Sequence, residues 1–477
     1  MTRLLPFAVA AIGLVGCPSD LPPAADDDDA ATPFEVIEWT AGPPPMSATA
    51  TPGHQALRVI AHLHSHWSHD ACDGVPQPGG VPDEACYQDL RQGLCTTRID
   101  VAFLSDHPGH ATETDYATLL LRRDGDGEIV DDAGAVVGTV ITCPDGHEVR
   151  LFPGVESGDM MPLALDAHVD GGYGGSTAAD QERVSDAGGI RWIAHTETRD
   201  LETLRAMQLE GIELYQLHAN LAPDLREDYL GLDPFGYLGE VGPFFFPETN
   251  GVLDPPHPDL APLGFLALNE PSIVALETLG QDQVLAVTGG TDAHQNVFPA
   301  EASDFERIDS YRRMMRWFNN WLLLPENEEV SPATLEAAMR GGKGFIVFEV
   351  FGTPEGFAVD VRPTGVETPV AFLGDEIALG DGLEVVVQPP NLDLRSPRDE
   401  ALPLVTTRVY LADAEGRTLL AEQDGSEPIR ASVSAPGVLR VEVWITPRHL
   451  RPYLGEVADD YVDTPIPWVQ TGGIFVR

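Results

Sequence analysis

The sequence predicts a mixed α/β fold over residues 51–350 and a small all-β sandwich over residues 351–477. In the first region, short continuous apolar runs alternate with helix-like stretches, which is typical of a parallel sheet covered on both faces. In the second region, apolar and polar residues alternate with a period of two, which indicates half-buried antiparallel strands. A chain of 477 residues is long enough for two such domains.

Each expected element is assigned from its own stretch of sequence. The parallel strands are expected at the apolar runs 56–61, 101–104, 151–152, 192–194, 211–215 and 284–287. Helices are expected after the sheet, at 306–324 and 332–340. Strands of the C-terminal sandwich are expected at 384–388, 407–411 and 439–445. This sandwich either braces the first domain or binds sugar or protein, and we favour bracing.

The first 17 residues predict an export signal. Arg3 precedes an apolar run that is of signal-peptide length and too short to span a bilayer. The run ends in LVGC at residues 14–17, which resembles the bacterial lipobox, in which the cysteine is acylated. An ordinary cleaved signal with an incidental cysteine is the alternative. We expect an exported lipoprotein, anchored to a membrane in the periplasm or at the cell surface through lipid on Cys17. Residues 18–50 are expected to be an acidic, disordered tether.

Charge and cysteine content narrow the possible functions. The 76 acidic and 28 basic residues give a formal net charge of -48, which disfavours nucleic acid as a partner, although a saline habitat also accounts for such acidity. Four cysteines follow Cys17, enough for two disulfides in an exported protein. We expect Cys72 to pair with Cys86 or Cys95. The spacing is not C-x-x-C, so it does not favour a structural zinc site.

Polar side chains lie just after the carboxyl end of several of the expected strands. The carboxyl ends of parallel strands meet at one face in α/β barrels, so side chains from separate strands can converge there. The His-x-His pattern at residues 62–64 places both imidazoles on one face, as shared ligation requires. The chemistry-bearing residues at these positions are His62, His64, His69, Asp70, Asp106, His107, Glu156, His168, His195, Asp292 and His294. Imidazoles and carboxylates in this arrangement predict a metal centre.

These residues resemble the motifs of the polymerase and histidinol phosphatase (PHP) superfamily of metal-dependent phosphoesterases. The resemblance covers about residues 57–350. It implies a distorted seven-stranded (β/α) barrel that holds two or three Zn, Mn or Fe ions. The motifs, in order, are His62-Leu63-His64 with Ser65, Ser68 and Asp70; Ser105-Asp106-His107; Pro153-Gly154-Val155-Glu156; Ala194-His195-Thr196, with Thr in place of the family's Pro; and Thr291-Asp292-Ala293-His294.

Carried over to this chain, the resemblance implies three metal positions. The ligands are His62, His64, Glu156 and Asp292 for the first metal; Glu156, His168 and His195 for the second; and Asp70, His107 and His294 for the third. His69 is an alternative to Asp70, and His147 or His218 an alternative to His168. Asp106 is expected to accept a hydrogen bond from a ligand imidazole rather than to bind metal.

The implied activity is hydrolysis of a small-molecule phosphomonoester or phosphodiester by a hydroxide held between the metals. Glu156 would bridge the cations, Asp106 would support the site, and His218 or His110 would protonate the leaving group. Arg191 and Arg199 are candidates for binding the phosphate group. The sequence does not name the substrate.

Two other functions compete with this interpretation. The amidohydrolase superfamily also opens with His-x-His on a barrel, and such an enzyme would hydrolyse a carbamate or carboxylester. Its binuclear members usually bridge their metals with a carbamylated lysine, whereas the only lysine here is Lys343, beyond the last ligand motif. The second competing function is that of a non-catalytic, metal-binding surface lipoprotein. The position of Glu156 favours the phosphoesterase.

Overall fold

The computed structural model describes residues 42–44, 46, 51, 53–392 and 402–477. The predicted signal peptide at 1–17 and most of the predicted tether at 18–50 lie outside the described residues. Within the described part, no helix is long and apolar enough to cross a membrane.

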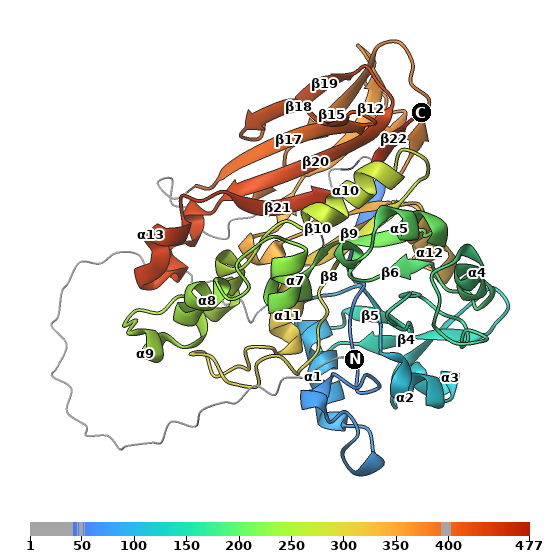
Figure 1. The fold of residues 1–477 in the computed structure, drawn as a ribbon, viewed down its shortest axis with the longest axis vertical. Helices are drawn as coiled ribbons and strands as arrows, with labels where there is room; N and C mark the ends of the chain where they lie inside the picture. Colours follow the sequence, from blue (N-terminus) through green and yellow to red (C-terminus); the bar gives the residue numbers. More distant parts are fainter. Residues whose placement is uncertain (1–41, 45, 47–50, 52, 393–401) are drawn as a thin grey trace. The chain divides into compact units, whose positions relative to one another are not determined.

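A mixed α/β arrangement fills the first part of the described chain, as predicted (Figure 1). Its strands are β1 (His54–Ile60), β2 (Val101–Phe103), β3 (Gly127–Val130), β4 (Val136–Thr142), β5 (Glu148–Phe152), β6 (Trp192–Ile193), β7 (Gly211–Gln216), β8 (Ala286–Gly290), β9 (Asn319–Pro325) and β10 (Gly344–Val347). β1, β2 and β5 run parallel in a large sheet, and β6, β7 and β8 run parallel in a separate three-stranded sheet. All five residues of β8 and all six of β7 are buried, as expected for parallel strands covered on both faces.

Isolated bridges connect the two groups of parallel strands. Leu63, just after β1, pairs in parallel with Ala293, just after β8. On the other side, Leu163 pairs with Ile190 shortly before β6. The first bridge joins the carboxyl ends of β1 and β8, and the two bridges do not by themselves confirm a closed seven-stranded barrel.

Helices separate the parallel strands, and their ends are set by local sequence. The helices of this part are α1 (Glu84–Thr96), α2 (Pro108–Glu113), α3 (Tyr116–Leu119), α4 (Ala178–Asp186), α5 (Leu201–Met207), α6 (Leu217–Leu221), α7 (Pro223–Asp228), α8 (Tyr237–Phe245), α9 (Pro247–Asn250), α10 (Glu270–Leu279), α11 (Tyr311–Trp317) and α12 (Pro332–Arg340). Asp83 caps α1 by accepting from the backbone N–H of Cys86, and Ser331 caps α12 through Thr334. The predicted helix at 332–340 is confirmed by α12.

The predicted helix at 306–324 is wrong over most of its length. A helix is present only in α11, and residues 319–325 form β9 instead. β9 pairs antiparallel with β1 on one side and with β10 on the other. The apolar run of residues 321–324 fits a buried strand as well as a helix, and pairing with these two neighbours decides between them.

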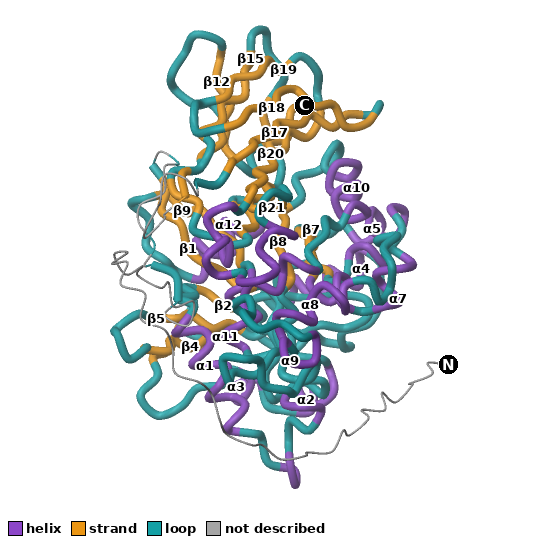
Figure 2. Tube along the Cα trace, turned by 90° about the vertical axis from the view of Figure 1, so that its left-hand side faces the viewer, coloured by secondary structure: helices purple, strands orange, loops and turns teal. Residues whose placement is uncertain are grey.

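Strands account for most of the regular secondary structure after residue 353, with loops and short helical turns between them (Figure 2). They are β11 (Pro354–Glu355), β12 (Ala358–Pro363), β13 (Ala371–Phe372), β14 (Glu376–Ile377), β15 (Leu383–Gln388), β16 (Asn391–Leu392), β17 (Leu404–Asp413), β18 (Gly416–Asp424), β19 (Ile429–Val433), β20 (Gly437–Thr446), β21 (Ile466–Thr471) and β22 (Ile474–Val476), with one short helix, α13 (Ala458–Tyr461). β12, β13, β15 and β19 form an antiparallel sheet of their own. β21 pairs with β10, so sheet hydrogen bonds cross the boundary predicted at residue 350. The division into two domains stays a prediction.

Two disulfides fasten the segments around the first strands. Cys72 pairs with Cys86, one of the two partners expected for it, and Cys95 pairs with Cys143. The first bond ties the loop after β1 to α1, and the second ties the end of α1 to the turn between β4 and β5. The loop that carries Asp70 is therefore linked covalently to α1 two residues later.

Candidate metal centre

The chemistry-bearing residues lie just beyond the carboxyl ends of the parallel strands. His62 and His64 follow β1, His107 follows β2, Glu156 follows β5, His195 follows β6, His218 follows β7, and Asp292 and His294 follow β8. Each strand is thus followed by a ligating side chain within four residues of its end. The parallel arrangement brings these positions to one face.

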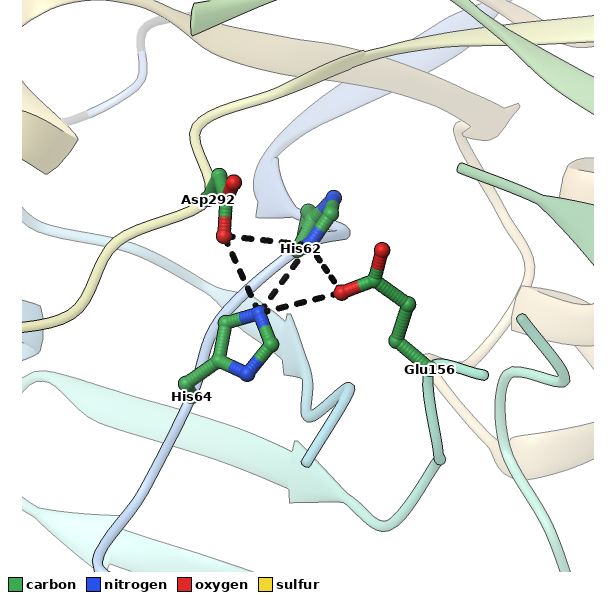
Figure 3. A group of neighbouring side chains, drawn as sticks. All are labelled: His62, His64, Glu156 and Asp292. Atoms are coloured by element: carbon green, nitrogen blue, oxygen red, sulfur yellow. Dashed lines mark hydrogen bonds and ion pairs between the residues drawn. The ribbon is translucent and has the colours of Figure 1, made fainter. Parts of the chain in front are cut away.

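Four donor atoms from three of these segments converge (Figure 3). Nε2 of His62 lies 3.0 Å from Nε2 of His64 and 3.0 Å from Oε2 of Glu156. Oδ1 of Asp292 lies 3.3 Å from Nε2 of His62 and 3.0 Å from Nε2 of His64. Nε2 of His64 lies 3.4 Å from Oε2 of Glu156. Donors placed about 2.0–2.1 Å from a tetrahedral cation are about 3.3–3.4 Å apart. The nitrogen and oxygen donors therefore fit a divalent cation in both type and spacing.

The imidazoles are held so that Nε2 faces the cluster. His62 donates from Nδ1 to Oε1 of Glu213 at 2.6 Å, inside a fully buried pair. Nδ1 of His64 lies 3.0 Å from the Ser68 hydroxyl. A hydrogen bond to the far ring nitrogen fixes the tautomer and the orientation of a ligating imidazole. This support leaves the near nitrogen lone pair available to a cation.

The same arrangement recurs at the neighbouring imidazoles. Nδ1 of His107 donates to the backbone carbonyl of Glu156 at 3.0 Å, and Nδ1 of His195 lies 3.2 Å from Oε1 of Glu197. Asn269 donates to the other Glu197 oxygen at 2.9 Å, which holds that buried carboxylate in place. Four imidazoles are thus anchored through Nδ1.

Two further groups of donors adjoin the first one. His64, Asp70 and His107 form one group, and His195, His218 and Asp292 form the other. Nε2 of His107 lies 3.0 Å from Oδ2 of Asp70, and Nδ1 of His218 lies 3.3 Å from Oδ2 of Asp292. Because Asp292 belongs to two of the groups, its two oxygens face different sets of donors.

Glu156 also faces two sets of imidazoles. Its Oε2 lies 3.0 Å from Nε2 of His62 and 3.8 Å from Nε2 of His107, whereas its Oε1 lies 3.6 Å from Nε2 of His195. A carboxylate whose oxygens point to different groups has the geometry of a bridge between two cations. The sequence prediction placed Glu156 in that position.

Burial and mutual charge shift the pKa values in the cluster strongly. Burial alone lowers the pKa of an imidazole, but the carboxylates of Glu213, Glu156 and Asp292 outweigh it and raise the pKa of His62 well above its ordinary value. At His64, burial again lowers the pKa, but the carboxylates of Asp70 and Asp292 outweigh it and raise the pKa to about 10. Despite burial, His62 holds the pKa of both Glu156 and Asp292 well below the usual range. The cluster is a buried anionic site that attracts positive charge, whether from protons or from metal.

Two of these residues adopt strained backbone conformations. His195 has φ 52° and Asp292 has φ 46°, in the left-handed region that costs a non-glycine residue about 1 kcal/mol or more. Such strain persists only where the surrounding structure enforces it, and it concentrates at functional sites. Here it accompanies two of the residues that converge on the cluster.

One solved structure similar to this chain contains a PHP-like domain. It is a two-domain protein from Bacteroides vulgatus, described as containing a predicted PHP-like metal-dependent phosphoesterase. The two chains are 11% identical, the match covers 89% of this chain and 98% of the other, and the TM-score is 0.37. A likeness at this level says nothing about activity. No protein-family model and no curated protein sequence matches this chain.

His168 is the one expected ligand that the structure does not bring to the cluster. Its Nε2 donates to the backbone carbonyl of Thr114 at 2.7 Å, and its Nδ1 lies 3.2 Å from the Tyr173 hydroxyl. Both ring nitrogens are therefore engaged in local contacts. His218, which the sequence allowed in its place and as a candidate acid, lies beside Asp292 and His195 instead. His218 directly follows a strand, as the other ligands do, and this signal was present in the sequence.

The structure places Asp70 in a donor group, whereas His69 and His147 have other contacts. Asp70 joins His64 and His107, while the exposed ring of His69 packs against that of His107 with centroids 4.7 Å apart. His147 donates to the backbone carbonyl of Ile99 at 2.8 Å, before β2 begins, and so lies on the far side from the cluster. His294 lies 3.7 Å from Asp292 but belongs to none of the three groups among the described residues.

Asp106 has a different contact from the one expected. Its carboxylate accepts from the backbone N–H of Ser65 at 2.5 Å and from the Ser65 hydroxyl at 2.8 Å, and not from a ligand imidazole. Burial raises its pKa to about 6. Asp106 therefore holds the segment that follows His64 and acts on the cluster indirectly.

Sequence reasoning missed Glu213 and Glu197, which support His62 and His195. Glu213 lies inside the fully buried β7, and a charged residue in such a strand indicates a functional or paired group. Of the two arginine candidates, Arg191 pairs with Glu210 before β6 begins, away from the cluster. Arg199 lies four residues after His195 and donates to the carbonyl of Gly158.

Proposed function

We propose that this chain is a metal-dependent hydrolase of small-molecule phosphate esters, either monoesters or diesters. The observation that carries the proposal is the convergence of His62, His64, Glu156 and Asp292 at 3.0–3.4 Å, with two further donor groups that share His64 and Asp292. The sequence motifs that resemble those of the PHP superfamily supply these residues in order. Adjoining groups of this kind suit two or three divalent ions of Zn, Mn or Fe.

The groups assign the candidate ligands to positions. The first position would take His62, His64, Glu156 and Asp292. The second would take His195, His218 and Asp292, with Glu156 as the bridge from the first position through Oε1, 3.6 Å from Nε2 of His195. The third would take Asp70 and His107, which form a group with His64, with His294 nearby. When bound, such cations lower the pKa of coordinated water from about 15.7 to about 7 and neutralise charge on the phosphoryl oxygens.

The chain's own residues orient the substrate and the ligands. Glu213, Glu197 and Ser68 fix the imidazoles that face the cluster. Arg199 would bind a non-bridging phosphoryl oxygen, since it is the arginine that follows a ligand at the carboxyl end of β6. His218, half exposed beside Asp292, would bind metal rather than protonate the leaving group.

Lys343 gives no support to an amidohydrolase function. Its ammonium group pairs with Oδ1 of Asp375 at 2.5 Å, in the loop before β10. This ion pair lies well after the ligand motifs in the sequence, and Glu156 would take the bridging position instead. The phosphoesterase proposal does not need a modified lysine.

The proposal extends to fold and location. The six parallel strands β1, β2, β5, β6, β7 and β8 support a distorted version of the seven-stranded barrel implied by the motifs. The LVGC sequence at 14–17 supports a lipoprotein anchored to a membrane through Cys17. Two disulfides suit an oxidising compartment outside the cytosol.

Metal analysis combined with a substrate panel tests the function. Purified protein loaded with Mn or Zn should hold two or three ions. It should hydrolyse a phosphomonoester or a phosphodiester, while hydrolysing a carboxylester poorly. Chelation should abolish the activity, and returning the metal should restore it. Less than one tightly bound ion after loading would overturn the proposal, and carboxylester hydrolysis alone would overturn the phosphate specificity.

A further inference from the structure

The side chain of Gln216 lies inside the proposed metal centre, although it belongs to none of the PHP-like motifs. Gln216 is the last residue of β7, and it is fully buried. It pairs with Gly290 at the end of β8, two residues before Asp292. Its amide nitrogen lies 3.2 Å from Oδ2 of Asp292 and 3.4 Å from Nε2 of His195. Gln216 therefore faces the second of the three proposed metal positions.

The amide is oriented with its NH₂ group toward this position. Oε1 of Gln216 accepts from the backbone N–H of Ala219 at 3.0 Å and so caps α6. Turning the amide over would place the NH₂ group against that N–H and remove the cap. The backbone is fixed as well, because the Asn220 side chain donates to the carbonyl of Gln216 at 3.1 Å. The side chain thus presents a donor, and not an acceptor, to the second position.

The second position has no carboxylate of its own among the described residues. Its imidazoles come from His195 and His218. Its two carboxylates, Asp292 and Glu156, both also face the first position. The third position differs, since its group includes the carboxylate of Asp70. With the shared carboxylates already neutralising a cation in the first position, a second cation would meet imidazoles and an N–H group whose partial positive charge opposes it.

The second position is also more open to water than the first. The side chains of His218 and His195 are 50% and 20% exposed. Those of His62 and His64 in the first position are fully buried. Water screens the attraction between a cation and its ligands, so an exposed position holds a cation less strongly. Charge and exposure therefore both weaken the second position relative to the first.

We propose that the second position is a labile metal site, and that Gln216 keeps it weak. The inference rests on the proposed function, because hydrolysis needs the ion in this position while the other ions stay bound without it. Activity then follows the free concentration of the divalent cation. An acidic side chain in place of Gln216 would supply the missing charge and hold the ion tightly.

Calorimetric titration of the metal-free protein with Mn tests the proposal. The weakest binding step should have a dissociation constant at least tenfold above those of the other steps, and phosphate-ester hydrolysis should rise along that step. Steps of equal affinity, or full hydrolysis before the weakest step, would overturn the labile site and leave the proposed function standing. A weak step without any hydrolysis would overturn the proposed function and, with it, the control of activity. Less than one bound ion would overturn both.

Two variants assign the weak step to Gln216. Gln216→Glu keeps the size of the side chain and one oxygen for the cap of α6, but it replaces the inward donor with a carboxylate oxygen. The weakest step should tighten at least tenfold, while the other steps stay within threefold. Gln216→Met removes the donor without adding charge, and its thioether does not suit Mn, which prefers oxygen donors. It should tighten the weakest step at least threefold.

The matched control is Gln88→Glu, which adds the same charge at an exposed position of α1 and should change no step. Circular dichroism should show which variants fold, and either folded Gln216 variant is sufficient for the test. A folded variant whose weakest step is unchanged would overturn the role of Gln216. Loss of the tighter steps in Gln216→Met would also overturn it, because the residue would then support the ligands of the first position.

Discussion

Replacing Glu213 with Gln should weaken metal binding without changing any proposed ligand. The carboxylate is fully buried, and each of its oxygens accepts a hydrogen bond from a different N–H group. Oε1 accepts from Nδ1 of His62 at 2.6 Å, and Oε2 accepts from the backbone N–H of His195 at 2.9 Å. A glutamine amide has one acceptor oxygen and one NH₂ donor. The variant must therefore face one of these two N–H groups with another donor.

The size of the effect follows from these two contacts. Removing the charged partner of a ligating imidazole costs about 10–100-fold in metal affinity. That range corresponds to about 1.4–2.7 kcal/mol. The buried N–H group left without an acceptor should also lower the free energy of unfolding of the metal-free protein by about 1–3 kcal/mol.

Competition with a chromophoric chelator measures the metal affinity, and thermal unfolding of the metal-free protein measures the stability. The matched control is Glu182→Gln in α4, where the side chain is exposed and the same chemical change should leave both quantities unaltered. If Glu213→Gln binds metal within twofold of the unchanged protein, the hydrogen bond to His62 does not support a ligand. The proposed orientation of that imidazole would then be wrong.

Three other predictions test separate parts of the structure. Glu156→Gln should lower phosphate-ester hydrolysis by at least about 100-fold and reduce the bound metal, because no bridging charge remains; full activity with full metal content would refute the bridge. Burial opposes ionisation of Glu349, but Arg58 outweighs it and lowers the pKa of Glu349 to about 2. The stability that this ion pair supplies is present above about pH 4.5 and is lost as the pH falls toward 2, by about 3 kcal/mol in all. Glu349→Gln should cost about 3–5 kcal/mol at neutral pH and flatten that acid dependence, and acid unfolding identical to that of the unchanged protein would count against the pair. Cys17→Ser should release the protein from membranes, and unchanged fractionation with no acyl mass on the N-terminus would exclude the lipid anchor.

Local sequence was sufficient for the residues that directly follow strands. The apolar runs that became β1, β2 and β8 are short and buried, and the polar residues after them stand out from that background. Parallel pairing requires that such positions meet at one face, so their convergence could be predicted from spacing alone. The choice of His62, His64, Glu156 and Asp292 among these residues came from their resemblance to the PHP motifs, and it needed no tertiary information.

Tertiary structure decided the assignments in which several residues satisfied the same pattern. The sequence favoured His168 over His218 as a ligand, but of these two only His218, just after β7, lies beside Asp292. The pairing of Cys72 with Cys86 rather than with Cys95 depended on where α1 packs, which spacing does not specify.

Tertiary contacts also decided the structure of residues 319–325 and the role of Glu213. Leucines and a tryptophan suit both a helix and a buried strand, and the neighbouring β1 and β10 supplied the hydrogen bonds that made β9. Glu213 acquired its role only when β7 was placed beside His62. Sequence thus determines which side chains can ligate and where the strands end. Only long-range packing determines which of the competing side chains reaches a shared point, because that depends on contacts between residues far apart in the chain.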